Sequence, residues 1–260
     1  TTAIKYLANV RYEVEGILKT SNILIGETGW PSEGRMREDA LPSKTNQAIF
    51  VREFVKLAEE KGWNYNIIEA FDQPWKRVSE GAVGGFWGLF DKDRLDKNVF
   101  TGDVSNFPNY KYLVFGSLLL IFGFSFLLKN SNISTKRVVL FSFINTIFAV
   151  LYMLQMEQFN ITVRSSGEVV WATLVLLTHL AIYYFVLLNI VKESKPKIVG
   201  IREILTNKIF NVDTLPMILF YSSFIFVLIS TIILAFEGRY RNFEIYIFAI
   251  SAISFVLLYG

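Results

Sequence analysis

Residues 23–32 read I-L-I-G-E-T-G-W-P-S, and this stretch decides how the N-terminal part of the chain is expected to fold. The apolar run at 23–26 is typical of a parallel strand that is buried on both faces. Glu27 follows directly and precedes a turn that contains a glycine and a proline. Because the loops after the strands of a parallel β/α barrel form the active site, this position indicates a catalytic carboxylate. A helix-capping or salt-bridged glutamate is the alternative that the pattern alone leaves open.

Helices and strands alternate around this stretch. The spacing of apolar residues predicts one helix over residues 4–19 and a second over residues 46–61. Thr45 is the expected N-cap of the second helix, and Gly62 is its expected C-terminal stop. A second strand is expected at residues 65–71, so the order predicts a parallel βαβ unit preceded by one helix.

Three motifs follow the two strands in order. They are G-E-T-G-W-P-S at residues 26–32, E-A-F-D-Q-P-W-K at residues 69–76, and W-G-L-F-D at residues 87–91. Together they resemble glycoside hydrolase family 17, the β-1,3-glucanase family. The resemblance implies that residues 1–108 form the last strands, seven and eight, of a (β/α)8 TIM barrel whose first six strands lie upstream. A fragment of this kind is expected to leave a strand edge exposed.

The resemblance also implies roles for individual residues. Glu27 matches the nucleophile of the family motif, whereas the general acid, a glutamate that follows an asparagine, has no counterpart because no Asn-Glu pair occurs. The chain alone is therefore expected to be inactive. A cation beside Glu27 would keep it ionised, as a nucleophile requires. The expected substrate-binding residues are Trp30, Phe71, Asp72, Trp75, Lys76 and Glu80.

These site residues also have structural interpretations. Lys76 and Glu80, which resemble the cleft lysine and glutamate of the family, are spaced like a surface ion pair on a helix. Trp30, Phe71 and Trp75 suit stacking on sugar rings, but they equally suit packing of a loop against a barrel. For Phe71 the packing interpretation is at least as strong.

The composition changes sharply after the first 111 residues. These carry 31 of the 49 charged residues and four of the five tryptophans. A transmembrane helix needs roughly 20 apolar residues, and residues 109–260 are therefore expected to form a polytopic helical membrane domain. Its five apolar stretches are residues 112–128, 138–156, 169–191, 215–236 and 243–259. The expected fold class is thus α/β plus membrane α-helical.

The charges between these stretches predict an orientation. Three cations, Arg164, Arg239 and Arg241, lie in one alternate set of connecting loops. Eight lie in the other set, which the positive-inside rule places in the cytoplasm. The barrel portion then lies on the periplasmic or extracellular side of the plasma (inner) membrane. The eight cations are Lys129, Lys136, Arg137, Lys192, Lys195, Lys197, Arg202 and Lys208.

Composition excludes several other functions. The net charge of +3 has no basic block interleaved with aromatic residues, so nucleic acid is not an expected partner. The chain has no cysteine, which excludes disulfides and thiol catalysis, and no cofactor or metal site is expected. The single histidine, His179, lies within a predicted span. A functional role there is one interpretation, and a neutral histidine bonded to a neighbouring helix is the favoured one.

The sequence therefore predicts a membrane-anchored, extracytoplasmic retaining glycoside hydrolase that cleaves β-1,3-glucan through a glucosyl–Glu27 intermediate. One alternative is a transglycosylase or branching enzyme in β-(1→3),(1→6)-glucan synthesis, because a sugar hydroxyl can replace water in the second step. An alternative of another class is a non-catalytic membrane protein that binds glucan or assists its export. The expected partners are a β-glucan and the lipid bilayer.

Overall fold

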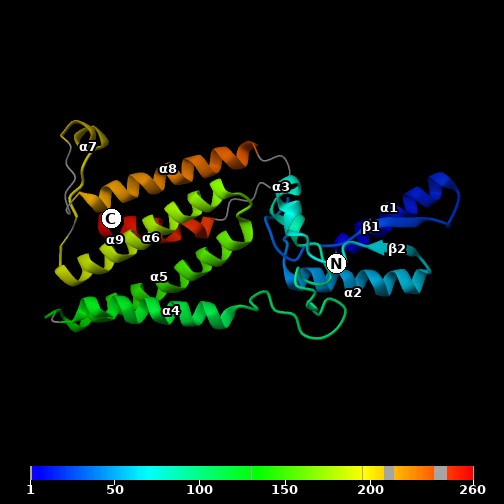
Figure 1. Ribbon diagram of the computed structural model, residues 1–260, viewed down its shortest axis with the longest axis horizontal. Coiled ribbons are helices and arrows are strands. Elements are labelled where there is room, and N and C mark those ends of the chain that lie inside the picture. The colour runs from blue at the N-terminus through cyan, green and yellow to red at the C-terminus, as the bar shows by residue number, and fades with distance from the viewer. Residues whose placement is uncertain (1, 130, 195, 208–213, 237–244, 260) are drawn as a thin grey trace. The chain divides into compact units, whose positions relative to one another are not determined.

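The computed structural model describes residues 2–129, 131–194, 196–207, 214–236 and 245–259. These residues form two compact units, and the chain passes from the first to the second between Pro108 and Asn109. The first unit contains two strands and helices, and the described residues of the second are helical where they are regular (Figure 1). Four of the cations counted above to predict the membrane orientation lie outside the described residues: Lys195, Lys208, Arg239 and Arg241.

The N-terminal unit has the predicted order of helix, strand, helix, strand. The two strands pair in parallel, with Leu24 opposite Asn64 and Ile25 opposite Tyr65. In the part of the chain that the structure describes, they form a two-stranded sheet, so a complete barrel is not present. The elements are α1 (Thr2–Leu18), β1 (Leu24–Thr28), α2 (Lys44–Lys61) and β2 (Asn64–Ile67).

The N-cap of α2 is Ser43, so the prediction of Thr45 was wrong. Ser43 is extended, with φ −163°, and its hydroxyl accepts a hydrogen bond from the backbone of Asn46. Thr45 lies inside the first turn, where its hydroxyl instead donates to Asn106 at 2.6 Å. Gly62 ends the helix as predicted, because its φ of 65° is left-handed and costs glycine little.

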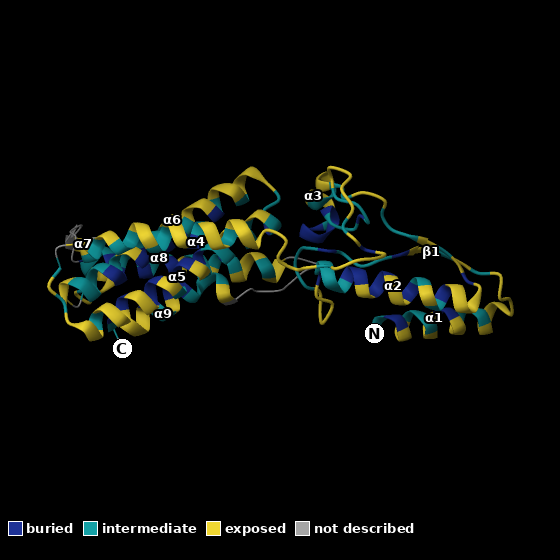
Figure 2. Cartoon of the chain, turned by 90° about the horizontal axis from the view of Figure 1, so that it is seen from below, coloured by how far each residue is buried: buried dark blue, intermediate teal, exposed yellow. Residues whose placement is uncertain are grey.

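One face of the sheet carries the core of this unit. Ile25, Tyr65 and Ile67 pack against a buried cluster that joins α1 to α2. The buried residues of α2 form a stripe along the helix (Figure 2). Leu24 is 59% exposed, so the prediction of a strand buried on both faces was wrong. The apolar run resembles a barrel strand, but the two helices of this unit cover one face only. The cluster consists of Ile4, Phe50, Val51, Phe54, Ala58, Trp63 and Val99.

β2 ends at Ile67, four residues before the predicted end at Phe71. Residues 69–72 instead pair in parallel with residues 87–90 through four backbone hydrogen bonds of 2.8–3.0 Å. Between these paired segments, residues 73–86 form a closed loop, which we call the excursion loop. It contains η1 (Pro74–Lys76), α3 (Arg77–Glu80) and η2 (Ala82–Gly85).

The C-terminal unit is a bundle of long apolar helices that lie alongside one another (Figure 1). Four helical segments among the described residues are long and apolar enough to cross a bilayer: Tyr110–Leu128, Thr135–Thr162, Ser166–Lys192 and Leu215–Phe236. The apolar helix Tyr246–Tyr259 is shorter, and the first two residues of the predicted fifth stretch are not described. The elements are α4 (Tyr110–Ser125), η3 (Phe126–Leu128), α5 (Thr135–Thr162), α6 (Ser166–Lys192), α7 (Ile201–Asn207), α8 (Leu215–Phe236), η4 (Ile245–Phe248) and α9 (Ala249–Tyr259).

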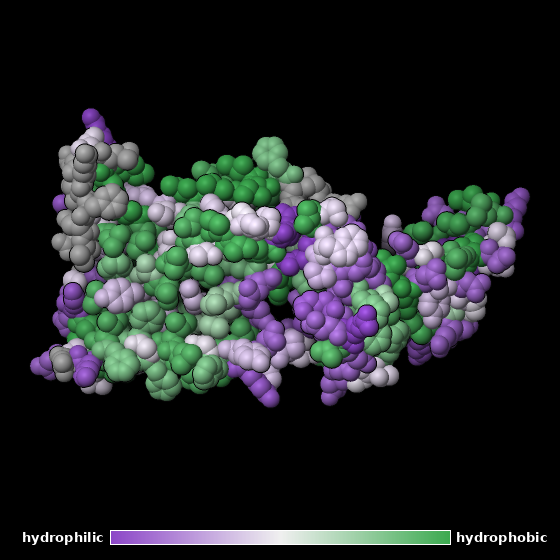
Figure 3. Space-filling model, in the orientation of Figure 1, coloured by the Kyte–Doolittle hydropathy of each residue, from purple (hydrophilic) through white to green (hydrophobic). Residues whose placement is uncertain are grey.

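The outer surface of these helices is largely apolar in the view of Figure 3, where green covers most of the bundle. Polar side chains instead join the helices inside it. The hydroxyl of Tyr183 donates to the Asn145 carbonyl at 2.8 Å, and the Asn145 amide donates to the Ile121 carbonyl at 3.0 Å, which links α6, α5 and α4. His179 is buried and its Nδ1 lies 2.7 Å from the amide of Gln155 on α5, as predicted for a histidine bonded to a neighbouring helix.

We expect Tyr183→Phe to destabilise the bundle by about 0.6–1.7 kcal/mol, the range measured for hydrogen bonds between membrane helices. The substitution removes only the hydroxyl that reaches Asn145. Tyr184→Phe is the matched control, because Tyr184 is 38% exposed and takes no part in this network. Unfolding of the detergent-solubilised chain, titrated with SDS and followed by circular dichroism, measures both variants. Equal effects of the two would show that the hydrogen bond contributes nothing specific.

Candidate active site

A bulge in β1 determines where Glu27 points. Between the pairs Ile25–Tyr65 and Thr28–Ile67, β1 uses one more residue than β2 does. Regular alternation would place Glu27 on the face of Ile25, which packs against the core of α1 and α2. With the bulge, Thr28 is buried and Glu27 is exposed. Bulges of this kind re-aim side chains next to active sites, and no residue pattern in β1 indicates this one.

The turn after Glu27 is attached to the excursion loop. The backbone N–H and the hydroxyl of Ser32 both donate to the carbonyl of Phe86, at 2.8 and 3.2 Å. Gly34 has φ 117° and lies so close to Val83 that a Cβ would be 2.6 Å from its side chain. The loop that carries Trp75, Lys76 and Glu80 is therefore held against the turn that follows the candidate nucleophile.

Lys76 forms its ion pair with Glu69. Its Nζ lies 2.6 Å from Glu69 Oε1, and the amide of Gln73 donates to the other oxygen of the same carboxylate. The hydrogen bond to Glu69 raises the pKa of Lys76, and the charges of Glu69, Glu80 and Glu27 act in the same direction. Lys76 therefore remains cationic at neutral pH and lies within electrostatic range of Glu27.

Asp72 is held by a lysine that the sequence analysis did not identify. Lys97 Nζ lies 3.0 Å from Asp72 Oδ1, and the two side chains are only 8% and 10% exposed. Asp72 Oδ1 also accepts from the Gly88 N–H at 2.8 Å, while Lys97 donates to the Gly88 carbonyl at 2.6 Å. Burial raises the pKa of Asp72 and lowers the pKa of Lys97. Asp72 thus fixes the peptide of Gly88 in this structure.

The three aromatic candidates have different surroundings. The indole N–H of Trp30 donates to the Leu41 carbonyl at 3.0 Å, and its ring packs 5.6 Å from that of Phe50. Phe71 packs against Phe90 with ring centroids 5.7 Å apart. Trp75 is the most open of the three at 69% exposed, and Lys76 Nζ lies 5.7 Å from its ring centroid. A broad exposed ring beside hydrogen-bonding groups is suited to stacking on a sugar.

Chemically, the arrangement presents one exposed carboxylate, that of Glu27, at the end of β1. Retaining glycosidases need two carboxylates about 5–5.5 Å apart, a nucleophile and a general acid. Glu69 and Asp72 are engaged with Lys76 and Lys97, so neither is free to donate a proton to a leaving group. In the part of the chain that the structure describes, no three acidic or histidine side chains are grouped so that they could hold a metal ion.

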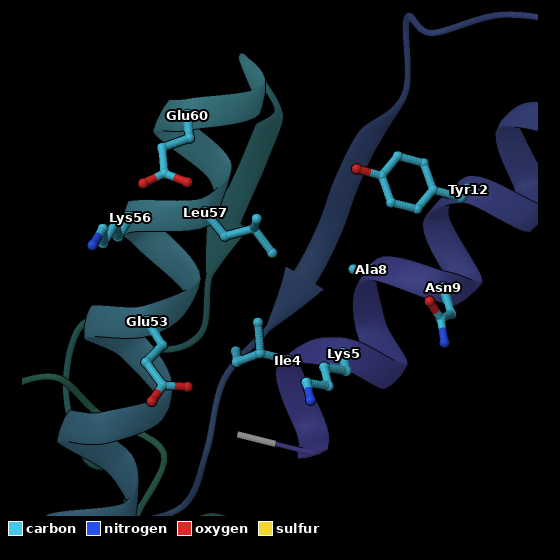
Figure 4. A pocket seen from close by; sticks show the side chains of 9 residues that line it. All are labelled: Ile4, Lys5, Ala8, Asn9, Tyr12, Glu53, Lys56, Leu57 and Glu60. Carbon is cyan, nitrogen blue, oxygen red and sulfur yellow. The ribbon is translucent and has the colours of Figure 1, made fainter.

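A separate groove of about 530 Å³ lies between α1 and α2. Its floor is apolar, with Ile4, Ala8 and Leu57, and Lys56 and Glu60 of α2 lie at its edge (Figure 4). It contains none of the site residues named above. The chemistry of Glu27 therefore does not belong to this groove.

Comparison with known proteins agrees with the motifs. Residues 1–88 match the BtgE/BtgC glycoside hydrolase domain family. A probable family 17 glucosidase from Saccharomyces cerevisiae is 32% identical over 72 residues, which cover 28% of this chain and 18% of that protein. The N-terminal unit is related to family 17 glycoside hydrolases. The resemblance noted at residues 26–32 is therefore confirmed at the level of the family.

Two further proteins match part of this chain. A glucan 1,3-β-glucosidase from the same yeast is 38% identical over 68 residues, or 25% of this chain and 22% of that protein. The chain thus spans about a fifth of the length of these curated relatives. A solved active-site mutant of the Rhizomucor miehei β-1,3-glucanosyltransferase in complex with laminaritriose aligns at 23% identity. Its TM-score is 0.35, over 39% of this chain and 36% of that one.

Proposed function

We propose that this chain is part of a membrane-anchored, extracytoplasmic retaining glycoside hydrolase that acts on β-1,3-glucan, with Glu27 as the nucleophile. Barrel strands outside these 260 residues would supply the general acid. The observation that carries the proposal is the β1 bulge, which turns Glu27 away from the core of α1 and α2 at the end of a parallel strand. In a β/α barrel that end of the strand faces the substrate.

Two features of the site support a nucleophilic role for Glu27. Lys76 is cationic, and the loop that carries it is tied by Ser32 to the turn after Glu27, the carboxylate that would attack the anomeric carbon. Trp75 offers an exposed ring from the excursion loop, and Ser32 ties that loop to the turn after Glu27. Trp75, Lys76 and Glu80 would line the substrate cleft. Trp30, Phe71 and Asp72 have more contacts with the protein and would act mainly by shaping it.

Membrane anchoring is supported by the second unit. Its four long helical segments have mean hydropathies of 2.0–2.4, and most of their residues are not buried inside the unit. Exposing that much apolar surface to water is unfavourable in free energy, whereas exposing it to lipid is not. The bias of cations toward one set of connections supports an extracytoplasmic position for the barrel portion, where a cell-envelope glucan would be its substrate.

Covalent trapping tests the proposal directly. An activated 2-deoxy-2-fluoro β-glucoside slows turnover of the glycosyl-enzyme, so the adduct can be located by peptide mass spectrometry in the protein with its complete barrel. We expect a mass increase of one glycosyl group on the peptide that contains Glu27. An adduct on another carboxylate, in a protein that cleaves laminarin, would overturn the assignment of Glu27. Glucan binding without turnover or adduct would instead favour the non-catalytic reading.

The same preparation distinguishes hydrolysis from transfer. Both start from the glycosyl-enzyme and differ in whether water or a sugar hydroxyl resolves it. With laminari-oligosaccharides as the only sugar, hydrolysis yields shorter products, whereas transglycosylation also yields products longer than the substrate. Longer or branched products would assign the protein to the transglycosylase alternative, and Glu27 would keep its role.

A further inference from the structure

Glu69 is an ionisable residue of the candidate site that has no role in the proposed reaction. Its side chain is only 14% exposed, and both of its carboxylate oxygens are occupied by donors. Lys76 reaches Oε1 at 2.6 Å, and the amide of Gln73 reaches Oε2. A carboxylate whose two oxygens accept from an ammonium and an amide is held in one orientation. It can neither attack a sugar nor protonate a leaving group while these contacts last.

The backbone of Glu69 is fixed as firmly as its side chain. Its N–H donates to the Trp87 carbonyl at 3.0 Å, and its carbonyl accepts from the Leu89 N–H at 2.8 Å. Lys76, by contrast, sits at the end of the short helix η1, and its flexible stem carries a single point charge. Fixing such a side chain costs rotamer entropy, so its position depends on the partner that holds it.

From these contacts we propose that Glu69, assisted by Gln73, is a positioning residue that holds the Lys76 ammonium at a fixed place in the excursion loop, which Ser32 ties to the turn after Glu27. This inference rests on the proposed function, since it gives the position of Lys76 a catalytic consequence. Glu69 would act only through Lys76 and would not touch the sugar.

The charges around Lys76 fix the direction of the expected change. Three carboxylates act on it, those of Glu69, Glu80 and Glu27, and Glu69 has the largest effect. The neighbouring Arg77 places its guanidinium over the ring of Phe86, 5.3 Å from the centroid. Removing the charge of Glu69 therefore withdraws the main stabilisation of the ammonium, and the pKa of Lys76 falls toward its ordinary value.

Glu69→Gln tests this on the chain as it exists, without any need for catalysis. It keeps the shape of the side chain and removes its charge. The acylation rate of Lys76 is measured against pH in the detergent-solubilised chain, with mass spectrometry of the modified peptide. Each unit by which the pKa falls raises the reactive amine fraction about tenfold at a pH below it. We expect faster acylation of Lys76 in Glu69→Gln and no change in Glu59→Gln, an exposed glutamate of α2.

A second variant separates loss of position from loss of fold. Gln73→Leu leaves the Glu69 charge in place and removes only its second donor, so we expect a smaller change in the same direction. Hydrogen exchange of residues 87–90 reports whether the paired segments remain closed. Unchanged acylation of Lys76 in Glu69→Gln, with the paired segments closed, would overturn the inference.

In the protein with its complete barrel, Glu69→Gln should lower kcat for laminarin on the order of 10- to 100-fold with a smaller change in KM. The alkaline limb of the kcat profile should move to lower pH. If Glu69→Gln changes the acylation rate of Lys76 but the wild type processes no glucan, the proposed function is wrong. The inference that Glu69 holds Lys76 would still stand. If the wild type processes glucan and neither acylation nor kcat responds, the positioning role fails alone.

Discussion

Glu27→Gln is expected to lower β-1,3-glucan turnover by the complete protein on the order of 10³-fold or more, because an amide of the same shape cannot attack the anomeric carbon. The bulge presents Glu27 on an exposed part of the strand, so the substitution should leave the fold intact. Release of reducing sugar from laminarin measures the loss. Glu38→Gln, an exposed glutamate in the loop after β1, is the matched control and should retain full activity.

Retained turnover in Glu27→Gln would remove the basis for assigning the reaction to this chain. The remaining interpretations would then be glucan binding or assistance with export. A loss of turnover in which glucan binding is kept would instead support a chemical role, since the variant still presents a side chain of the same size.

Lys97→Met is expected to destabilise the paired segments around Asp72 by about 3–5 kcal/mol, the usual cost of leaving one member of a buried ion pair without its partner. Asp72 would keep only the Gly88 N–H as a donor. Hydrogen exchange of residues 69–72 and 87–90 in the detergent-solubilised chain measures the local opening free energy. The exposed pair Lys92–Asp93 provides the control, and Lys92→Met should leave the opening of these segments unchanged because solvent screens an exposed ion pair.

The double variant Asp72→Asn/Lys97→Met distinguishes the contribution of the ion pair from the other contacts of Lys97. Removing both charges leaves no buried ion unpaired, so it should be more stable than Lys97→Met alone. If the double variant is as unstable as the single one, the main contribution of Lys97 is the packing of its stem and its bond to the Gly88 carbonyl. The ion pair itself would then contribute little.

Local patterns predicted the parts of the fold that depend on local physics. The apolar spacing of α1 and α2 and the left-handed stop at Gly62 follow from interactions within a few residues. The cap of α2 was less certain, because Ser43 and Thr45 have equivalent hydroxyl groups and only the path of the preceding loop distinguishes them. The order of the strands also followed from the sequence, whereas the exposure of Leu24 depended on which elements cover the sheet.

The site was predictable in its residues but less so in its contacts. The motif at residues 69–76 contains both Lys76 and its partner Glu69, but their spacing of seven positions gave no indication that they form an ion pair. Lys97 is 25 positions from Asp72 and lies in no motif, so only the folded chain brings the two together. The β1 bulge is a property of the register between two strands. No inspection of β1 alone could have revealed it.

The closed base of the excursion loop has a consequence for protein engineering. The paired segments 69–72 and 87–90 form this base. A Cβ on Gly88 would lie 2.1 Å from the Asp72 nitrogen, so a substitution of Gly88 would break the pairing that closes the loop. Val78 near the tip is 76% exposed and takes no part in that pairing. A directed-evolution library confined to residues 78 and 79 would therefore vary the surface of the loop tip while the paired base keeps its register.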